Sequence, residues 1–251
     1  MNKIKAEPTG LHERLSEFDE YAGDYNAGME NPIKRLLGSS ADDYIDVKAK
    51  WLIRYLEKDN RGLPDKPMRM LDFGCGLGVL LRAVHRRGFK GSLHGCDVSE
   101  QMLQRAEKMV GSIADFTLIS ENEVPFQDDT FDVVVASSVL HHIPSADRDR
   151  YYKELIRILA PGGALVVFEH NPRNPLVRWV VSRTPIDKNA VLLDSSEVQQ
   201  AFKHFQMLNV DCQYILFMPP RFKCMQSLER HLIQVPLGGQ YAVSGLKPPI
   251  R

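Results

Sequence analysis

From residue 68 onward, short apolar runs alternate with stretches that carry apolar side chains at helical spacing. The apolar runs, each typical of a buried strand, occupy residues 68–73, 92–98, 116–120, 131–137 and 163–170. One helix is predicted from Ser99 onward and another over 145–159, because apolar residues recur there on one face. Strands that alternate with helices build a parallel sheet through right-handed crossovers, so the pattern predicts an α/β fold.

The two ends of the chain depart from this alternation. Residues 1–66 are polar and helical in pattern; residues 40–43 resemble a capping box. An apolar stripe at helical spacing follows, formed by Tyr44, Val47, Trp51 and Tyr55. Residues 205–220 and 238–248 predict two late strands, compatible with an antiparallel strand at the sheet edge. We therefore expect a helical cap over 1–66 and one structural unit over 67–251.

Composition and charge narrow the choice of partners. The chain has 32 basic and 32 acidic residues and no net charge, which leaves no electrostatic footprint for nucleic acid. Its four cysteines form no CxxC pair, as suits a reducing compartment. The N-terminus lacks the apolar core of a signal peptide, and no run approaches the roughly 20 apolar residues that span a bilayer. We expect a cytoplasmic protein with no nucleic-acid partner and no stable membrane insertion.

A glycine-rich turn joins the first predicted strand to a helix. Its glycines are Gly74, Gly76 and Gly78, and the backbone N–H groups of such a turn can face a polar or anionic ligand. Asp97 ends the second strand, where a carboxylate can accept hydrogen bonds from both hydroxyls of a ribose. Together they predict a ligand that contains an adenosine. A turn without a ligand, and an acid that only favours a helix N-terminus, are the alternatives.

Three features favour S-adenosylmethionine over a dinucleotide. The glycines follow the pattern GxGxG instead of GxGxxG, because Val79 occupies the sixth position. Asp72 precedes the first glycine by two residues, where it repels a pyrophosphate but attracts an ammonium or a sulfonium. Residues 1–66 precede the first strand, whereas dinucleotide-binding domains often begin near it.

Four motifs in order resemble those of class I S-adenosylmethionine-dependent methyltransferases, in particular the ubiquinone- and menaquinone-type group. They are LDFGCGLG, CDVS, VPFQDDTFDVVVASSVLHHI and ILAPGGALVVFEH, all within residues 68–170. The resemblance implies a Rossmann-like seven-stranded sheet of order 3-2-1-4-5-7-6, with strand 7 antiparallel. It also implies S-adenosyl-L-methionine as the cofactor.

The resemblance further implies which residues contact the cofactor. They are Asp72, Gly74, Cys75, Gly76, Gly78, Asp97, Val98, Ser120, Glu121, Asn122, Ser137, Tyr25 and Lys48. Ser120 stands where the family often has an adenine-contacting aspartate, so Asn122 or a backbone group is expected to replace it. Tyr25 is expected either to cover the cofactor or to pack in the cap. Lys48 either pairs with the cofactor carboxylate or extends its ammonium to solvent.

Methyl transfer is an in-line displacement, in which the protein positions the nucleophile and removes a proton from an alcohol, phenol or protonated amine. His141 and His142 end the fourth predicted strand and His170 ends the fifth, so we expect all three at the ligand-binding edge as candidate bases. Strand periodicity directs His141 and His142 to opposite faces. The resemblance implies His142 as the first candidate, because LHH-like motifs of the family more regularly keep the second histidine. The alternative is that the pair only shapes its turn.

The loop after the fifth strand is long and contains two Asn-Pro steps, and we interpret it as a substrate lid, with a structural crossover as the alternative. No metal-binding set is evident, because HHIPSAD follows strand four where metal-dependent O-methyltransferases have an aspartate-rich cluster. The predicted function is metal-independent methyl transfer to a small-molecule, lipid-precursor or sugar acceptor, helped by a histidine base. The alternatives are an NAD(P)-dependent oxidoreductase and a non-catalytic protein that binds an adenosine cofactor.

Overall fold

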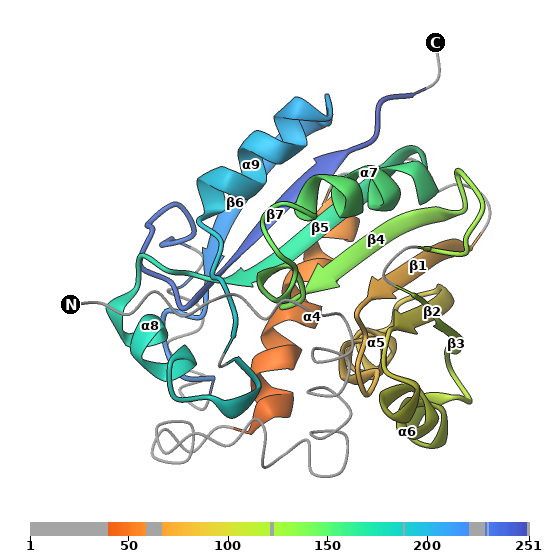
Figure 1. The fold of residues 1–251 in the computed structure, drawn as a ribbon, viewed down its shortest axis with the longest axis horizontal. Helices are drawn as coiled ribbons and strands as arrows, with labels where there is room; N and C mark the ends of the chain where they lie inside the picture. The colour runs from red at the N-terminus through yellow and green to blue at the C-terminus, as the bar shows by residue number, and fades with distance from the viewer. Residues whose placement is uncertain are drawn as a thin grey trace.

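A seven-stranded sheet forms the centre of the computed structural model, which describes residues 40–58, 67–120, 123–187, 189–220, 229 and 231–249 (Figure 1). The strands are β1 (Met68–Phe73), β2 (Gly91–Asp97), β3 (Asp115–Leu118), β4 (Phe131–Ser137), β5 (Leu159–His170), β6 (Leu208–Ile215) and β7 (Gln240–Leu246). Their order is β3-β2-β1-β4-β5-β7-β6. β7 runs antiparallel to β5 and β6, whereas the other neighbouring pairs are parallel. The structure therefore confirms the predicted order and the reversed strand.

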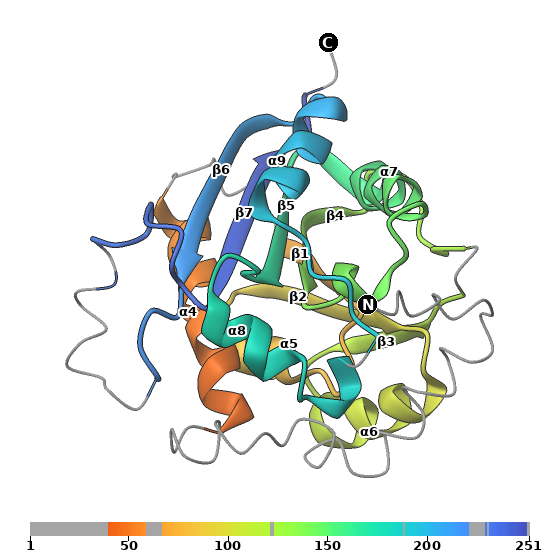
Figure 2. The ribbon, with the colours of Figure 1, turned by 60° about the vertical axis from the view of Figure 1, so that its left-hand side comes forward.

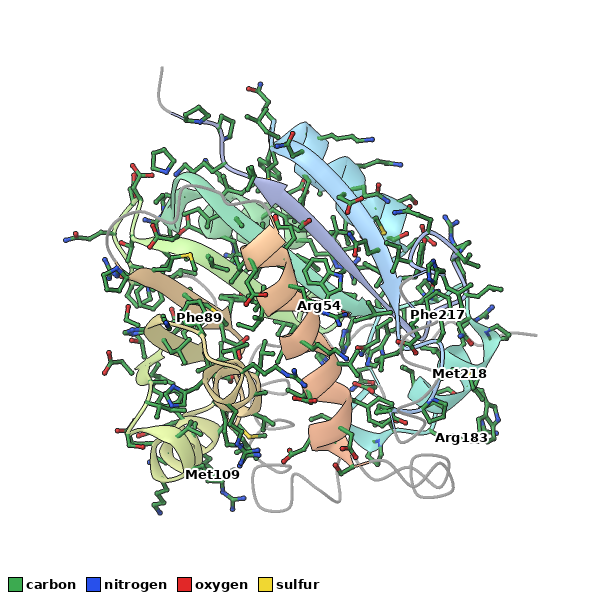
Figure 3. The ribbon with its side chains drawn as sticks, turned by 180° about the vertical axis from the view of Figure 1, so that it is seen from behind. Arg54, Phe89, Met109, Arg183, Phe217 and Met218 are labelled. Atoms are coloured by element: carbon green, nitrogen blue, oxygen red, sulfur yellow. The ribbon has the colours of Figure 1, made fainter. Side chains whose placement is uncertain are left out.

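Helices cover both faces of this sheet. They are α4 (Ala41–Lys58), α5 (Val79–Arg86), α6 (Glu100–Val110), α7 (Arg148–Ile158), α8 (Pro175–Val181) and α9 (Ser195–His204), with 3-10 turns η1 (Leu140–His142) and η2 (Pro185–Asp187). α7 and α9 cover one face, and α4 and α5 cover the other, which Figure 3 shows from behind. α8 lies beyond the carboxyl end of β5 (Figures 1 and 2). None of the described helices is both long enough and apolar enough to cross a bilayer.

The central strands are apolar at most positions because both of their faces are covered. On β4, Val134 and Ala136 pack into the core that α7 and α9 share, whereas Val133 and Val135 pack into the core beneath α4 and α5. Such strands appear in a sequence as continuous apolar runs. This explains why residues 131–137 could be predicted with their observed bounds.

α4 is the described part of the predicted cap, and it lies flat on the sheet. Its capping box is confirmed: the Asp43 N–H donates to Ser40 Oγ (3.3 Å), and the Ser40 N–H donates to Asp43 Oδ2 (2.7 Å). The predicted stripe is displaced by one residue. The fully buried apolar residues are Ala49, Leu52 and Leu56, whereas the four residues predicted are half-buried. Residues 1–39 and 59–66 of the predicted cap lie outside the described part of the chain.

The sixth strand is shorter than predicted at both ends. α9 ends in a C-cap at Phe205, and Gln206 adopts a left-handed backbone conformation (φ 58°), so the strand cannot begin before that turn is complete. Beyond Ile215, Leu216 is also left-handed (φ 60°), which stops the extended run. Neither conformation leaves a signal in an apolar pattern, because neither residue is a glycine.

Candidate active site

A cavity of about 810 Å³ lies at the carboxyl ends of β1, β2, β4 and β5. The loop after β1 and the end of β2 form one side of it, and the turns after β4 and β5 form the other. α4 contributes Ile45 and Lys48, while α8 contributes Val177 and Val180. Open α/β sheets bind ligands at this edge, where the strand order reverses next to β1. The cavity is therefore the candidate active site.

The loop after β1 can approach a ligand with its backbone. Gly74 and Gly76 both have positive φ (71° and 50°), a conformation that glycine adopts without strain. A Cβ at Gly74 would also lie 2.4 Å from a methyl carbon of Val139, so that glycine fits the loop against the end of β4. A Cβ at Gly76 would meet no atom within 4 Å, and Gly76 lines the cavity. Gly76 therefore leaves backbone open toward a ligand.

Asp97 holds this loop in place while it lines the cavity. Its Oδ2 accepts a hydrogen bond from the Gly76 N–H (2.8 Å), and its Oδ1 accepts one from the Ser99 N–H (3.0 Å). A carboxylate has about four acceptor positions, and two of these bonds of Asp97 go to the backbone. The structure thus gives Asp97 a structural role, and its contact with a ribose stays a prediction.

Asp72 is a buried carboxyl group with an unsatisfied oxygen. Its side chain is 2% exposed and lines the cavity, and its Oδ1 has no hydrogen-bond partner. Burial raises the pKa of Asp72 to about 8, although the ammonium of nearby Lys48 opposes the rise. An unsatisfied buried carboxyl oxygen costs free energy until a donor reaches it. The position therefore suits a cationic group of a ligand.

Lys48 does not extend to solvent, so that alternative is wrong. The residue is 2% exposed, and its Nζ donates hydrogen bonds to Ser137 Oγ and Ser138 Oγ, each 2.9 Å long. Both serines line the cavity at the end of β4. The buried ammonium thus lies at the cofactor side of the site, between the end of β4 and the carboxyl of Asp72.

The other predicted cofactor residues differ in where they lie. Cys75 and Val98 line the cavity, and burial raises the pKa of the Cys75 thiol well above its usual value, so it stays protonated. Ser120 is exposed, whereas its neighbour Ile119 lines the cavity. Gly78 is left-handed (φ 68°) and forms the N-cap of α5. Tyr25, Glu121 and Asn122 lie outside the described residues.

The expectation that His141 and His142 point to opposite faces of a strand is wrong. β4 ends at Ser137, and both histidines belong to the 3-10 turn η1, which places their ring centroids 4.1 Å apart. His142 and His170 line the cavity. His141 lies behind them with 1% of its side chain exposed, and its ring centroid is 5.4 Å from that of His170.

His141 lies between two carboxylates. Its Nδ1 is 2.5 Å from Glu169 Oε2, and its Nε2 is 3.5 Å from Asp187 Oδ1. Burial alone lowers the pKa of His141, but the two carboxylates outweigh it and raise that pKa to about 9. Glu169 also accepts a hydrogen bond from the Leu140 N–H (2.8 Å), so one buried carboxylate holds both the ring and the turn that carries it.

The two histidines that line the cavity are neutral near pH 7. Burial lowers the pKa of His142 to about 3, and the positive charge of His141 adds to this effect. Burial likewise lowers the pKa of His170 to about 4. A neutral imidazole keeps one nitrogen as a hydrogen-bond acceptor. Both rings can therefore accept a hydrogen bond or a proton from a group in the cavity.

Asp187 is the site residue that the sequence did not reveal. It lies in η2, inside the segment interpreted as a lid, and its Oδ1 is 3.5 Å from His141 Nε2 and 3.7 Å from His142 Nε2. Burial alone would raise the pKa of Asp187, but the neighbouring histidine rings outweigh it and lower that pKa to about 2. The Val191 N–H donates to the His141 carbonyl (2.8 Å), which fixes the end of this segment to η1. The predicted lid thus forms one wall of the cavity.

Comparison with known proteins finds similarity to methyltransferases. A family profile described as "Methyltransferase domain" matches residues 70–163. A 2-methyl-6-phytyl-1,4-hydroquinone methyltransferase of Synechocystis sp. is 30% identical over 156 residues, which are 59% of this chain and 45% of that protein. The Staphylococcus aureus demethylmenaquinone methyltransferase is 35% identical over 107 residues, which are 41% of this chain and 44% of that protein. The chain spans less than half the length of these curated relatives.

A solved structure shares nearly the whole fold. The crystal structure of a possible histamine N-methyltransferase from Thermotoga maritima matches 93% of this chain and 99% of its own, with a TM-score of 0.64 and 17% identity. Residues 70–163 thus match a methyltransferase domain, and the chain has the fold of S-adenosylmethionine-dependent methyltransferases. The methyltransferase motifs fall at the cavity: the profile begins within β1 and ends within β5, and so includes the glycine loop, Asp97 and the histidine turn.

The residues of the methyltransferase cavity fit the cofactor of this class. The unsatisfied Oδ1 of Asp72 provides an acceptor for an ammonium group. The open side of Gly76 leaves space for a ligand next to backbone N–H groups. Asp97 presents a carboxylate at the end of β2. These three features all line the cavity, and their chemistry is compatible with a cofactor that has an amino group and a ribose.

Proposed function

We propose that this protein transfers a methyl group from S-adenosylmethionine to a small-molecule acceptor. The observation that carries the proposal is the different polarity of the two sides of the cavity. One side presents the glycine loop, the unsatisfied Asp72 and the carboxylate of Asp97, whereas the other side presents the neutral rings of His142 and His170. The first side suits a cationic adenosine cofactor, and the second suits the acceptor.

At the cofactor side, each polar group has a separate task. Asp72 receives the amino group, and Asp97 receives the ribose hydroxyls while it holds Gly76. The Lys48 ammonium, held by two serine hydroxyls, supplies positive charge for the cofactor carboxylate. The bound cofactor supplies the electrophilic methyl group. The chain itself orients the two reactants and excludes water from between them.

At the acceptor side, the walls are apolar. α8 contributes Val177, Val180 and Val181, and η2 contributes Ile186. Apolar walls with a few polar groups select an acceptor that has an apolar body and one reactive polar atom. A named relative acts on a phytyl hydroquinone, a molecule of that kind. We therefore favour a lipid-precursor or phenol-type acceptor over a free sugar.

His170 is the proposed proton acceptor. It ends β5 and lines the cavity, and its neutral ring can take the proton of a hydroxyl nucleophile. His142 was expected to be the first candidate, but its Nε2 lies 3.7 Å from Oδ1 of Asp187, so the carboxylate lies at the edge of the ring that carries this nitrogen. His141 is buried behind both and does not line the cavity. Because the carboxylates of Glu169 and Asp187 flank its ring, we assign His141 a positioning role.

The oxidoreductase alternative is not favoured. It requires a dinucleotide pyrophosphate at the glycine loop, beside Asp72 and Asp97. An ionised carboxylate repels that group, and Asp72 offers it no hydrogen-bond donor above pH 8. A non-catalytic role does not explain why two neutral histidines face the same cavity.

Calorimetry with S-adenosylhomocysteine and with NADH tests the cofactor. We expect S-adenosylhomocysteine to bind with a dissociation constant on the order of 1–100 μM and NADH not to bind. Gly76→Ala should weaken the binding, because its new methyl group enters the open side of the loop. Gly88→Ala is the matched control, since Gly88 also has a positive φ (84°) and open surroundings but does not line the cavity. NADH binding without S-adenosylhomocysteine binding would overturn the proposal.

A further inference from the structure

Three potential metal ligands converge at the acceptor side of the cavity. They are His141 Nε2, His142 Nε2 and Asp187 Oδ1, and candidate ligand atoms of these three residues all lie within 4.8 Å of one another. Asp187 Oδ1 is 3.5 Å from the His141 nitrogen and 3.7 Å from the His142 nitrogen. The three residues come from two turns, η1 and η2, which the chain brings together across about 45 residues. His142 and Asp187 also line the cavity.

The His141 nitrogen in this group is buried without a hydrogen-bond partner. Its side chain is 1% exposed, and the nitrogen makes no hydrogen bond in the structure. The 3.5 Å to Asp187 is too long for a charge-assisted hydrogen bond, which measures about 2.7–2.9 Å. It is close to the separation of two ligands on one ion: with bonds of about 2.0–2.2 Å, tetrahedral ligands lie about 3.3–3.5 Å apart. The spacing therefore suits a shared cation better than a direct contact.

The other nitrogen of His141 has the partner that metal-bound histidines usually have. Its Nδ1 lies 2.5 Å from Oε2 of the buried Glu169. A hydrogen bond from Nδ1–H to a carboxylate orients the ring, so that Nε2 presents its lone pair when a metal ion displaces the proton from this nitrogen. Glu169 is itself held by the N–H groups of Val139 and Leu140 (3.2 and 2.8 Å). The ring of His141 is thus fixed before any ligand arrives.

We propose that His141, His142 and Asp187 form a site for a divalent transition-metal ion, with Glu169 as the carboxylate that orients His141. Two imidazoles and one carboxylate suit Zn²⁺, Fe²⁺ or Mn²⁺. Three protein ligands leave at least one coordination position open, and His142 and Asp187 place that position toward the cavity. The proposal replaces the expectation of a metal-free reaction, which rested on the residues directly after strand four and did not include Asp187.

A cation at this site would activate the acceptor for methyl transfer; this inference rests on the proposed function. An acceptor hydroxyl that binds the cation loses its proton more readily, because the positive charge stabilises the oxyanion. His170 takes that proton. The oxygen then forms a bond to the methyl carbon as the bond between that carbon and the sulfonium sulfur breaks, and S-adenosylhomocysteine leaves. No electron transfer is needed, so the ion remains divalent throughout.

Metal binding can be measured without any acceptor. The full chain is stripped with a chelator, and ZnCl₂ or MnCl₂ alone is titrated in a calorimeter, with elemental analysis for the stoichiometry. We expect one ion per chain in the wild type. Asp187→Asn removes an anionic ligand at nearly constant size and should weaken binding at least 100-fold, whereas Glu169→Gln should weaken it about 10–100-fold. His204→Ala removes an exposed histidine from α9 and should change nothing.

Each variant is also titrated with S-adenosylhomocysteine, which reports on the fold and on the cofactor side. The proposal predicts that Asp187→Asn keeps its affinity for S-adenosylhomocysteine while it loses the metal. A correctly folded wild type that binds no stoichiometric ion would overturn the metal site and leave the proposed function intact. Unchanged metal affinity in Asp187→Asn, or a loss of binding in His204→Ala, would overturn it as well. Loss of S-adenosylhomocysteine binding in the wild type would instead overturn the proposed function.

Discussion

Asp72→Asn tests whether the buried carboxyl receives the amino group of the cofactor. Burial raises the pKa of Asp72 to about 8, and the nearby Lys48 opposes this rise. In the cofactor-free protein the carboxyl is therefore mostly protonated at pH 6.5 and about half ionised at pH 8. An ammonium group pairs with the ionised form, so binding below pH 8 must release a proton.

The magnitude follows from the position of that pKa. At pH 6.5 only about one molecule in thirty carries the carboxylate, which weakens cofactor binding about 30-fold relative to the ionised protein. At pH 8 the loss is only about twofold. We therefore expect the affinity for S-adenosylhomocysteine to rise about 15-fold from pH 6.5 to pH 8, with nearly one proton released per ligand at pH 6.5. In Asp72→Asn this component of the proton release and the pH dependence should be absent.

Calorimetry in two buffers of different ionisation enthalpy gives the proton count, and the difference between the two proteins separates Asp72 from the amine of the ligand. Asp115→Asn is the control, because that side chain is 81% exposed on the edge strand β3. Stability gives an independent check. The pKa of Asp72 lies above its ordinary value of 3.8, so the free energy of unfolding of the wild type should fall, relative to Asp72→Asn, as the pH rises from about 4 through 8. Equal proton release by the wild type and Asp72→Asn at pH 6.5 would refute this reasoning.

Two further variants separate the two sides of the cavity. Asp97→Ala removes the carboxylate that we propose to bind the ribose hydroxyls, so we expect S-adenosylhomocysteine binding, measured by calorimetry, to weaken by about 2–4 kcal/mol. The same change removes two hydrogen bonds to backbone N–H groups, so the free energy of unfolding, measured in urea, should fall by about 2 kcal/mol. Wild-type affinity in this variant would contradict its role at the ribose. His170→Ala should lower turnover about 10²–10⁴-fold in an assay with a labelled methyl group, while S-adenosylhomocysteine affinity stays the same. Full turnover in that variant would exclude His170 as the proton acceptor.

The sheet could be predicted from the sequence because its central strands are buried on both faces. Such strands appear as continuous apolar runs, and the bounds predicted for β1 and β4 agree with the structure. α4 was predicted less well. A stripe of large aromatic residues suggested its buried face, but Ala49 and Leu52 lie closest to the sheet, and Trp51 stacks on Tyr55 at the margin. The positions of the large side chains therefore predicted the buried face of α4 only to within one residue.

Several residues predicted for the cofactor side do line the cavity, because they lie in the glycine loop or at a strand end; their contacts with the cofactor stay predictions. The acceptor side could not be predicted, because its geometry depends on two short 3-10 turns that no hydrophobic period reveals. In η1 the rings of His141 and His142 lie next to each other instead of on opposite faces of a strand. η2 brings Asp187 to these rings from a segment that was interpreted only as a lid. The signal for Asp187 is a single acidic residue that follows Thr184 and Pro185, and such a pattern is common on protein surfaces.

The two sides of the cavity are joined at the carboxyl end of β4. Ser137 and Ser138 hold the ammonium of Lys48, which opposes the rise in the pKa of Asp72 on the cofactor side. The next residues form η1, whose N–H groups bind Glu169, and Glu169 in turn holds His141 on the acceptor side. A shift of this one segment would therefore change the charge around the cofactor and the position of the histidines together. In the proposed reaction the methyl group crosses between these two sides, and a single segment that carries groups of both sides favours an in-line arrangement of donor and nucleophile.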